Sequence, residues 1–230
     1  MQDRVVFTIA NKNDLQRFND LSKDITRLTL VADNNKFEVD LGILNHLPNI
    51  EELALAGHFT GLEKVAMLKN LHSLSLQLKL KENDDLECMM TSTLTYLEVR
   101  DMRKLSDLSF IEKAPNLRKL FLMSLPSVYR LPRLNNIYAL KIYELHKLVE
   151  LDELKESKIK YLGLDLCSDT LSGTALAKII SCMSSIDQVD THLDRNFKRD
   201  NVVCNQLIKM KLENLISDTG IMNMDNFLKL

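Results

Sequence analysis

A short hydrophobic pattern, L-x-x-L-x-L with Ile and Val allowed at the apolar positions, recurs along most of this 230-residue chain. Seven clear copies and one degenerate copy begin at intervals of 20 to 27 residues. Eight copies at such regular spacing indicate that one structural unit is repeated, because chance matches would not keep their distance. The copies begin at Ile25, Ile50, Leu71, Leu94, Leu117, Ile137, Ile159 and Ile186.

The alternation inside each copy predicts a short β-strand. In L-x-L the two leucines point to one side of the strand, and the residue between them points to the other. One coil of chain cannot bury its own apolar side, so coils of this kind stack and their strands pair in parallel. The sequence therefore predicts a ribbon of about eight strands, on the order of 35 Å long.

With this spacing and leucine pattern, the chain resembles leucine-rich-repeat proteins over about residues 5–193. The resemblance implies an α/β solenoid of about eight coils. Its parallel β-ribbon would line a concave face, and short helices and extended segments would form the convex face. We expect an N-terminal cap at residues 1–24, repeats at 25–193 and a helical C-terminal cap at 194–230. The alternative for the last segment is a separate functional tail.

Both expected caps contain a pattern that suits their place. Residues 5–9 alternate like a strand, which is enough for an atypical first coil. In the last segment, Val203, Leu207 and Met210 recur at helical spacing and predict a closing helix. Such elements would cover the apolar surface that the ends of a solenoid otherwise expose.

The repeats depart from the family pattern at their ninth position. Many leucine-rich repeats carry an Asn there, and its amide satisfies buried backbone groups between coils. Here that polar ladder is missing, and three central copies carry a hydrophobic residue instead, so we expect apolar packing and irregular coils. This Asn-poor spacing resembles bacterial or intracellular receptor-type repeats. The ninth positions hold Asp33, His58, Lys79, Met102, Leu125, Leu145 and Cys167.

Composition restricts the class of protein. A formal net charge of −2 argues against general adhesion to nucleic acid or membranes. The sequence has no run near the roughly 18 apolar residues that cross a bilayer, and its N-terminus lacks the pattern of a signal peptide. The four cysteines form no CxxC pair, which is typical of reduced thiols. We expect a cytoplasmic protein; a secreted effector without a signal peptide would share these features.

The sequence contains few of the motifs that mark catalytic, phosphate-binding or metal-binding sites. It contains no Gly-rich phosphate loop, GxSxG, HExxH or paired-Cys metal motif. Cys167-Ser-Asp169 matches the Cys-x-Asp signature of bacterial ubiquitin ligases with leucine-rich repeats, but in those proteins the cysteine lies in a separate helical domain. Asp165, Asp190 and His192 fit the polar edge of the last coil better than a metal site. We therefore expect no enzymatic activity, cofactor, metal or small-molecule substrate.

The outward positions of the strands change character along the chain. They are mostly small in the first three repeats, whereas the next four carry four of the five tyrosines on or beside one face. Tyr and Arg dominate the energetic centres of protein interfaces, so this face is a candidate binding surface. Alternatively, the aromatic rings pack on one another and on lysine stems. The candidate residues are Tyr96, Glu98, Arg100, Lys119, Phe121, Met123, Tyr138, Lys141, Tyr143, Tyr161 and Asp165.

The same stretch is locally basic. Residues 100–147 contain ten Lys or Arg and four Asp or Glu, a balance of +6. An acidic protein surface would be steered toward such a face, while the modest excess argues against nucleic acid. The alternative is that these charges are scattered over the convex side, where they would carry no function.

Together these features predict a non-enzymatic protein-recognition module, such as an adaptor, an inhibitor or an immunity-type protein. It would bind a partner with an acidic surface through the concave face of repeats four to seven. One alternative is a substrate-recruiting component of a ubiquitin-ligase or effector system, and another is a self-associating structural solenoid. Resemblance at the level of the fold does not separate these functions.

Overall fold

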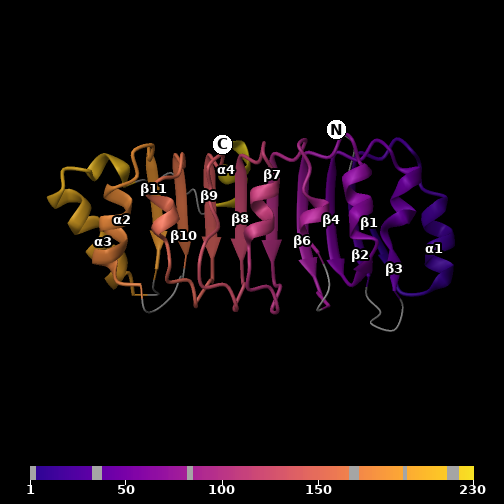
Figure 1. Ribbon diagram of the computed structural model, residues 1–230, viewed down its shortest axis with the longest axis horizontal. Coiled ribbons are helices and arrows are strands. Elements are labelled where there is room, and N and C mark those ends of the chain that lie inside the picture. Colours follow the sequence, from indigo (N-terminus) through magenta and orange to yellow (C-terminus); the bar gives the residue numbers. More distant parts are fainter. Residues whose placement is uncertain (1–3, 33–37, 82–84, 166–170, 194–195, 217–222) are drawn as a thin grey trace.

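The chain forms an elongated parallel sheet of nine strands, in the order β1-β2-β4-β6-β7-β8-β9-β10-β11 (Figure 1). The spatial order follows the chain order, so each strand belongs to one coil that stacks on the coil before it. The predicted α/β solenoid is therefore confirmed. The computed structural model describes residues 4–32, 38–81, 85–165, 171–193, 196–216 and 223–230.

Eight of the strands contain the repeated leucine pattern, and β1, from the expected N-terminal cap, adds a ninth in the same register. The strands are β1 (Val5–Ile9), β2 (Arg27–Ala32), β4 (Glu52–Gly57), β6 (Ser73–Leu78), β7 (Tyr96–Arg100), β8 (Lys119–Met123), β9 (Ala139–Tyr143), β10 (Tyr161–Asp165) and β11 (Gln188–His192).

The leucines of successive repeats stack in rows inside the solenoid. Leu120 of β8 pairs with Leu97 of β7 on one side and with Leu140 of β9 on the other, and all three are fully buried. Burying one such side chain stabilises a protein by roughly 1.5–3 kcal/mol. The recurring leucine pattern thus accounts for both the sheet register and the core.

The return path of each coil crosses one face of the sheet (Figure 1). The segment around Pro126 and Pro132 contains no helix, as expected of a proline-containing stretch. A small second sheet pairs β3 (Val39–Asp40) with β5 (Phe59–Thr60). The helices on this side are η1 (Leu41–His46), η2 (Leu62–Met67), η3 (Glu87–Met89), η4 (Ser109–Lys113) and η5 (Asp152–Leu154), all 3₁₀, and α2 (Gly173–Ser181).

The ninth repeat position is filled by apolar side chains in the central coils. Met102, Leu125 and Leu145 are at most 1% exposed, so apolar packing replaces the missing polar ladder there. Asp33 and Cys167, which hold this position in two other repeats, lie outside the described residues.

The residue before each of these buried side chains turns the chain at the end of its strand. In three successive coils this residue has a left-handed backbone with φ between 51° and 54°, although none is glycine. Such a conformation costs roughly 1–2 kcal/mol per residue. Each backbone N–H donates to a carbonyl of the next coil, which offsets part of that cost. The bonds run from Asp101 to Met123 (3.1 Å), from Ser124 to Tyr143 (2.9 Å) and from Glu144 to Asp165 (3.0 Å).

The N-terminal end of the core is closed by α1 (Lys12–Asn19). Asn11 caps this helix by accepting hydrogen bonds from the backbone N–H groups of residues 13 and 14, and Asp14 bonds back to Asn11. Phe18, fully buried, packs edge-on against Phe7 with ring centroids 5.2 Å apart. The first coil is thus covered by a helix with a complete capping box.

At the other end, α2 is covered by α3 (Lys198–Lys209), which is followed by η6 (Glu213–Leu215). Val203 and Leu207 are buried, as their helical spacing predicts. Met210 was expected on the same apolar face but is 41% exposed; it lies one residue beyond the helix, which ends at Lys209. The carboxylate of Asp200 accepts the backbone N–H of Leu193 at 3.0 Å, which ties α3 to the last coil.

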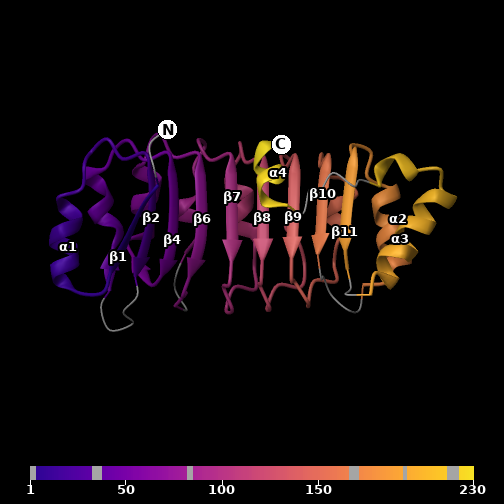
Figure 2. The same cartoon turned by 180° about the vertical axis from the view of Figure 1, so that it is seen from behind.

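The final helix, α4 (Met224–Lys229), does not lie at this end. Both views place it over the middle of the sheet, on the face opposite the 3₁₀ helices, and Figure 2 shows it in front of β8 and β9. Segment 194–230 therefore has two parts with different positions. None of the helices within the described ranges is long and apolar enough to cross a membrane.

Candidate functional site

The residues between the leucines point out of the solenoid on the face where α4 lies, which we call the outward face. Pairing of β7, β8, β9 and β10 places these residues in three rows. Tyr138 lies one residue before β9, beside the rows, and Ala139 takes the outward position. The rows are Tyr96-Lys119-Ala139-Tyr161, Glu98-Phe121-Lys141-Gly163 and Arg100-Met123-Tyr143-Asp165.

The sequence-predicted site residues are thus brought together, but the chain itself covers their centre. Phe227 of α4 is fully buried in a small cluster with Phe121 and Ala139. Partly buried apolar side chains surround this cluster: Tyr96, Met123, Tyr138, Tyr143, Tyr161, Met224 and Leu230. We refer to this set of residues as the aromatic patch.

Polar contacts fix the position of α4. Asn223 caps the helix by accepting the backbone N–H of Asp225 at 2.9 Å. At the other end, the Nζ atom of Lys119 donates to the carbonyl oxygen of Leu228 at 2.6 Å. Burial lowers the pKa of Lys119 from its usual value. The lysine thus satisfies one of the backbone carbonyls that the end of a helix leaves without an intrahelical partner.

Two side chains that the sequence places outward are almost inaccessible in the structure. Phe121 is 6% exposed and Lys141 is 4% exposed, where an open surface was expected. The Nζ atom of Lys141 lies 4.9 Å from the centroid of the Phe121 ring, an arrangement that favours a cation over an aromatic face. The ring thus faces the ammonium group of the lysine, whereas the alternative to a binding surface expected packing on the aliphatic stem.

Charged groups continue the outward face toward the last coil. Burial raises the pKa of Asp165, while the neighbouring His192 and Lys141 oppose that rise. The Nδ1 atom of His192 lies 3.7 Å from an Asp165 carboxylate oxygen. Among the described residues, no three His, Cys, Asp or Glu side chains are arranged to hold a metal ion. Cys167 and Asp169, the Cys-x-Asp pair, lie outside those residues.

A groove of about 820 Å³ lies beside α4 on the outward face, toward the first repeats. Its charged lining is net positive, because Arg4, Arg27, Arg118 and Lys119 outnumber two glutamates, and we call it the basic groove. The Nε atom of Arg27 lies 3.0 Å from a carboxylate oxygen of Glu52, and Arg4 pairs with the same carboxylate. The partly exposed aromatic patch and this basic groove are continuous, since residues of α4 line both.

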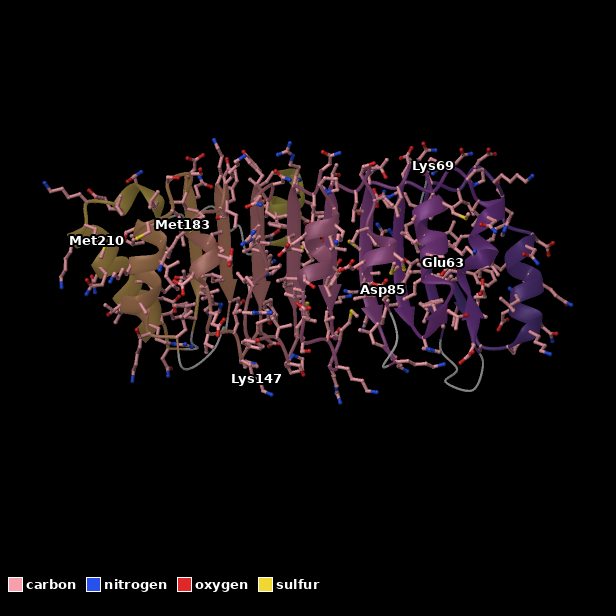
Figure 3. The ribbon with its side chains drawn as sticks, viewed as in Figure 1. Glu63, Lys69, Asp85, Lys147, Met183 and Met210 are labelled. Carbon is pink, nitrogen blue, oxygen red and sulfur yellow. The ribbon has the colours of Figure 1, made fainter. Side chains whose placement is uncertain are left out.

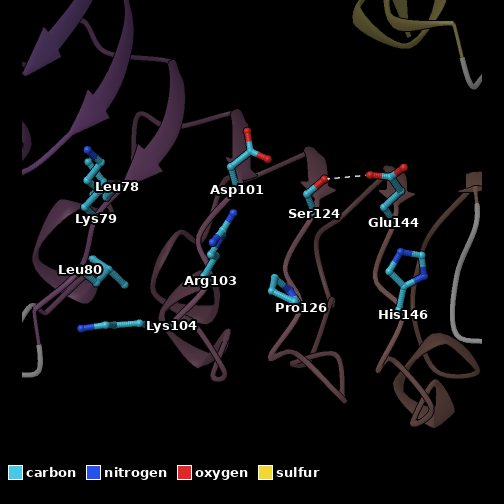
Figure 4. Close-up of a pocket in the computed structure, with 10 residues that line it drawn as sticks. All are labelled: Leu78, Lys79, Leu80, Asp101, Arg103, Lys104, Ser124, Pro126, Glu144 and His146. Atoms are coloured by element: carbon cyan, nitrogen blue, oxygen red, sulfur yellow. Dashed lines mark hydrogen bonds between the residues drawn. The ribbon is translucent and has the colours of Figure 1, made fainter. Parts of the chain in front are cut away.

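The other basic residues of segment 100–147 are distributed around the coil. Arg103 and His146 line a hollow of about 730 Å³ at the edge where the strands end (Figure 4). In that hollow Ser124 donates to Glu144 at 3.1 Å, and charges of both signs are present. Figure 3 shows Lys147 projecting at this same edge. The local charge excess therefore does not form one continuous surface.

Sequence reasoning missed Phe227, the buried residue of α4, and the place of Arg4 and Arg118 in the groove. The signal for α4 is weak, since Asn223 is an ordinary capping residue and a single aromatic residue follows in a six-residue helix. Arg4 and Arg118 lie immediately outside strands, where the repeat pattern does not assign a direction.

Neither a protein-family model nor a curated protein matches this chain. Among solved structures, internalin InlF from Listeria monocytogenes aligns at 16% identity with a TM-score of 0.50, over 93% of this chain and 61% of that protein. Internalin C2 from the same organism aligns at 18% identity with a TM-score of 0.42, over 80% of this chain and 67% of that one.

A leucine-rich-repeat protein from Leptospira interrogans aligns at 19% identity with a TM-score of 0.47, over 83% of this chain and 47% of that one. This chain therefore spans less than two thirds of the InlF and Leptospira structures. Taken with the nine-strand parallel sheet and its stacked leucine rows, the similarity to internalin InlF shows that the chain has the leucine-rich-repeat fold.

Proposed function

We propose that this chain is a non-enzymatic protein-recognition module in the cytoplasm, with its binding site on the outward face of repeats four to seven. One observation carries the proposal: the aromatic patch is partly exposed and continues into a basic groove. Contiguous apolar surface rimmed by polar groups is characteristic of interaction sites. Tyr side chains supply large contact area at low entropic cost, which suits the centre of an interface.

The charge of the groove indicates the kind of partner. Four basic side chains face two glutamates there, and Glu52 is already shared by Arg4 and Arg27. An acidic protein surface would find the remaining positive charge at Arg118 and Lys119. Complementary charge of this kind increases the rate of encounter and selects between partners more than it raises affinity. An adaptor, an inhibitor and an immunity-type protein would all use such a site.

The first test is site-specific photocrosslinking in a lysate of the cells that produce the protein. A crosslinking residue replaces Tyr143 on the outward face or, as a control, Tyr129, which is 43% exposed on the other side of the coil. An adduct formed only from position 143 identifies the partner. Adducts of equal yield from both positions contradict a site on the outward face.

The second test uses the purified partner. Arg118→Glu reverses an exposed charge in the groove, and Arg133→Glu reverses one on the far side of the coil as a matched control. We expect Arg118→Glu to weaken binding by about tenfold or more, and Arg133→Glu to change it less than about twofold. Equal effects of the two reversals would exclude recognition through the groove.

A further inference from the structure

We propose that α4 occupies the binding site of the partner in the free protein. The partner inserts a short amphipathic helix, with an aromatic side chain in the place of Phe227, and displaces α4. This inference rests on the proposed function and specifies the partner's recognition element. The contacts of α4 show what the outward face accepts, because α4 is a helix seated on the face through one aromatic ring.

The Phe227 ring packs against the sheet beside Phe121 and Ala139, and we call this place the seat of the ring. A small residue gives the seat its shape. Ala139 occupies the outward position between Lys119 and Tyr161, where a larger side chain would fill the space. Phe227 is fully buried there, with Phe121 as its aromatic neighbour. An aromatic side chain entering a pocket with a well-packed rim is the usual anchor of a helix bound in a groove.

The hydrogen bond from Lys119 to the helix does not depend on which side chains the helix carries. Lys119 bonds the main-chain carbonyl of Leu228, and any helix ending at this place would present a carbonyl to the same lysine. Recognition of α4 therefore uses two features, an aromatic ring and a helix C-terminus, that a partner helix can reproduce in full.

The attachment of α4 is suited to exchange. A helix of six residues is far below the length that is stable alone in water, so α4 depends on its contacts with the sheet. Phe227 is its one residue classed as buried, while its neighbour Leu228 is 47% exposed. A segment held by so few buried groups belongs to the least stable part of a fold and opens without unfolding the rest.

A partner helix gains contacts that α4 does not make. Leu228 and Leu230 line the basic groove, so the residues after the anchor share that groove with Arg118. A partner with carboxylates at these positions would be attracted to the positive charge of Arg118, whereas this chain presents leucines there. This differential contact gives the partner the advantage it needs to displace a tethered competitor.

The test uses a labelled peptide of residues 223–230 and the full-length chain. We expect the peptide to bind the Phe227→Ala chain, whose seat is vacated, at least about tenfold more tightly than the wild-type chain, whose own α4 competes. A peptide carrying Leu230→Glu is expected to bind more tightly still, and a peptide carrying Phe227→Ala not to bind. Equal binding to both chains, or no binding to the Phe227→Ala chain, would overturn the proposal.

A second variant checks the location of the peptide. Ala139→Leu in the Phe227→Ala chain fills the seat from the outward side and should abolish peptide binding, with circular dichroism confirming an intact fold. Undiminished binding to this folded variant would also overturn the proposal. Light scattering of the wild-type chain should give a monomer; a dimer that Phe227→Ala dissolves would mean that α4 binds a second copy instead.

These measurements require no natural partner, so they can fail or succeed separately from the proposed function. If the peptide binds but no acidic partner is crosslinked at position 143, the outward face binds a helix and the proposed function is rejected. A partner crosslinked at position 143 that does not compete with the peptide would retain the proposed function and reject the displacement of α4.

Discussion

The rings of Phe121 in β8 and Phe227 in α4 lie with centroids 6.4 Å apart and planes tilted by 57°, which joins the last helix of the chain to the middle of the sheet. Tilted and offset aromatic pairs contribute about 0.5–1.5 kcal/mol beyond the burial of their area. The face expected to receive a partner is therefore partly occupied by the chain itself, and several measurements can detect that occupancy.

Phe227→Trp creates a single fluorescent reporter, because the chain contains no Trp. We expect blue-shifted emission and protection from iodide quenching, since the native side chain at this position is fully buried. Leu228→Trp is the matched control on the same helix, where the native residue is 47% exposed, and its emission should be that of a solvated indole. Equal quenching of the two reporters would show that α4 does not seat its aromatic residue in solution.

Leu120→Ala and Tyr143→Ala separate the inside of the solenoid from the outward face. Leu120 is fully buried between two leucines, so its truncation should lower the free energy of unfolding by roughly 2–5 kcal/mol. Tyr143 is only partly buried, and Tyr143→Ala should cost less than about 1.5 kcal/mol. Urea unfolding of both variants measures the difference, and similar costs would mean that the tyrosine belongs to the core.

Two glycines with positive φ should tolerate Ala to different degrees. At Gly57 (φ +115°) a Cβ atom would lie 2.2 Å from the carbonyl oxygen of Ala32, so the backbone must shift. At Gly61 (φ +67°) the nearest atoms are the carboxylate oxygens of Asp40 at 3.0 Å, on a side chain that can move. Gly61→Ala should cost about 1–2 kcal/mol, as expected for the left-handed region, and Gly57→Ala distinctly more. Thermal unfolding gives the order, which a larger loss at Gly61 would contradict.

The glutamate of the basic groove predicts a pH dependence of stability. Burial acts to raise the pKa of Glu52, but the hydrogen bonds and charges of Arg27 and Arg4 outweigh it and hold this pKa below its usual value. A depressed pKa in the folded state contributes stability that is present above the unfolded pKa of about 4.3 and is lost as pH falls through the folded value. Glu52→Gln should therefore lower the free energy of unfolding at pH 7, and the difference from wild type should shrink below about pH 4.

We expect a loss of less than about 1 kcal/mol at pH 7, because the ion pairs are partly exposed. Glu153→Gln, at an exposed position of η5, is the control for loss of one negative charge. Unfolding curves of both variants at pH 3.5 and pH 7 make the comparison. A destabilisation by Glu52→Gln that persists unchanged at pH 3.5 would assign the effect to packing.

The repeat period predicts those parts of the fold in which each coil obeys the same rule. The row through Leu97, Leu120 and Leu140 follows from alternation within L-x-L and from stacking of coils, so strands, register and core can be read from the sequence. The replacement of the polar ladder follows in the same way, because Met102 and Leu125 occupy a repeated position whose direction is fixed by their neighbours.

The burial of residues at the centre of the candidate site cannot be predicted from the repeat. Phe121 and Lys141 alternate outward as predicted, yet they are buried because a distant segment lies on them. No local pattern places that segment: α4 is too short for a hydrophobic period, and its position depends on a tertiary contact made by Phe227. Outward direction is a property of the strand, whereas exposure depends on what the rest of the chain covers.

The stacking of one coil per strand also sets a limit on how the molecule could grow. Ile216 pairs with Val189 at the end of the sheet. Asn223, the N-cap of α4, follows seven residues later, so the tether from Ile216 to Asn223 can span at most about 25 Å. The three to four strand spacings to the seat of Phe227 already take up roughly 14–19 Å of this length. One coil inserted between β9 and β11 would raise the required span to about 19–24 Å, and two would raise it to about 24–29 Å, at or beyond the limit of the tether. In the evolution of such repeats, the number of coils on this side of the site is therefore restricted by a short piece of chain outside the repeats.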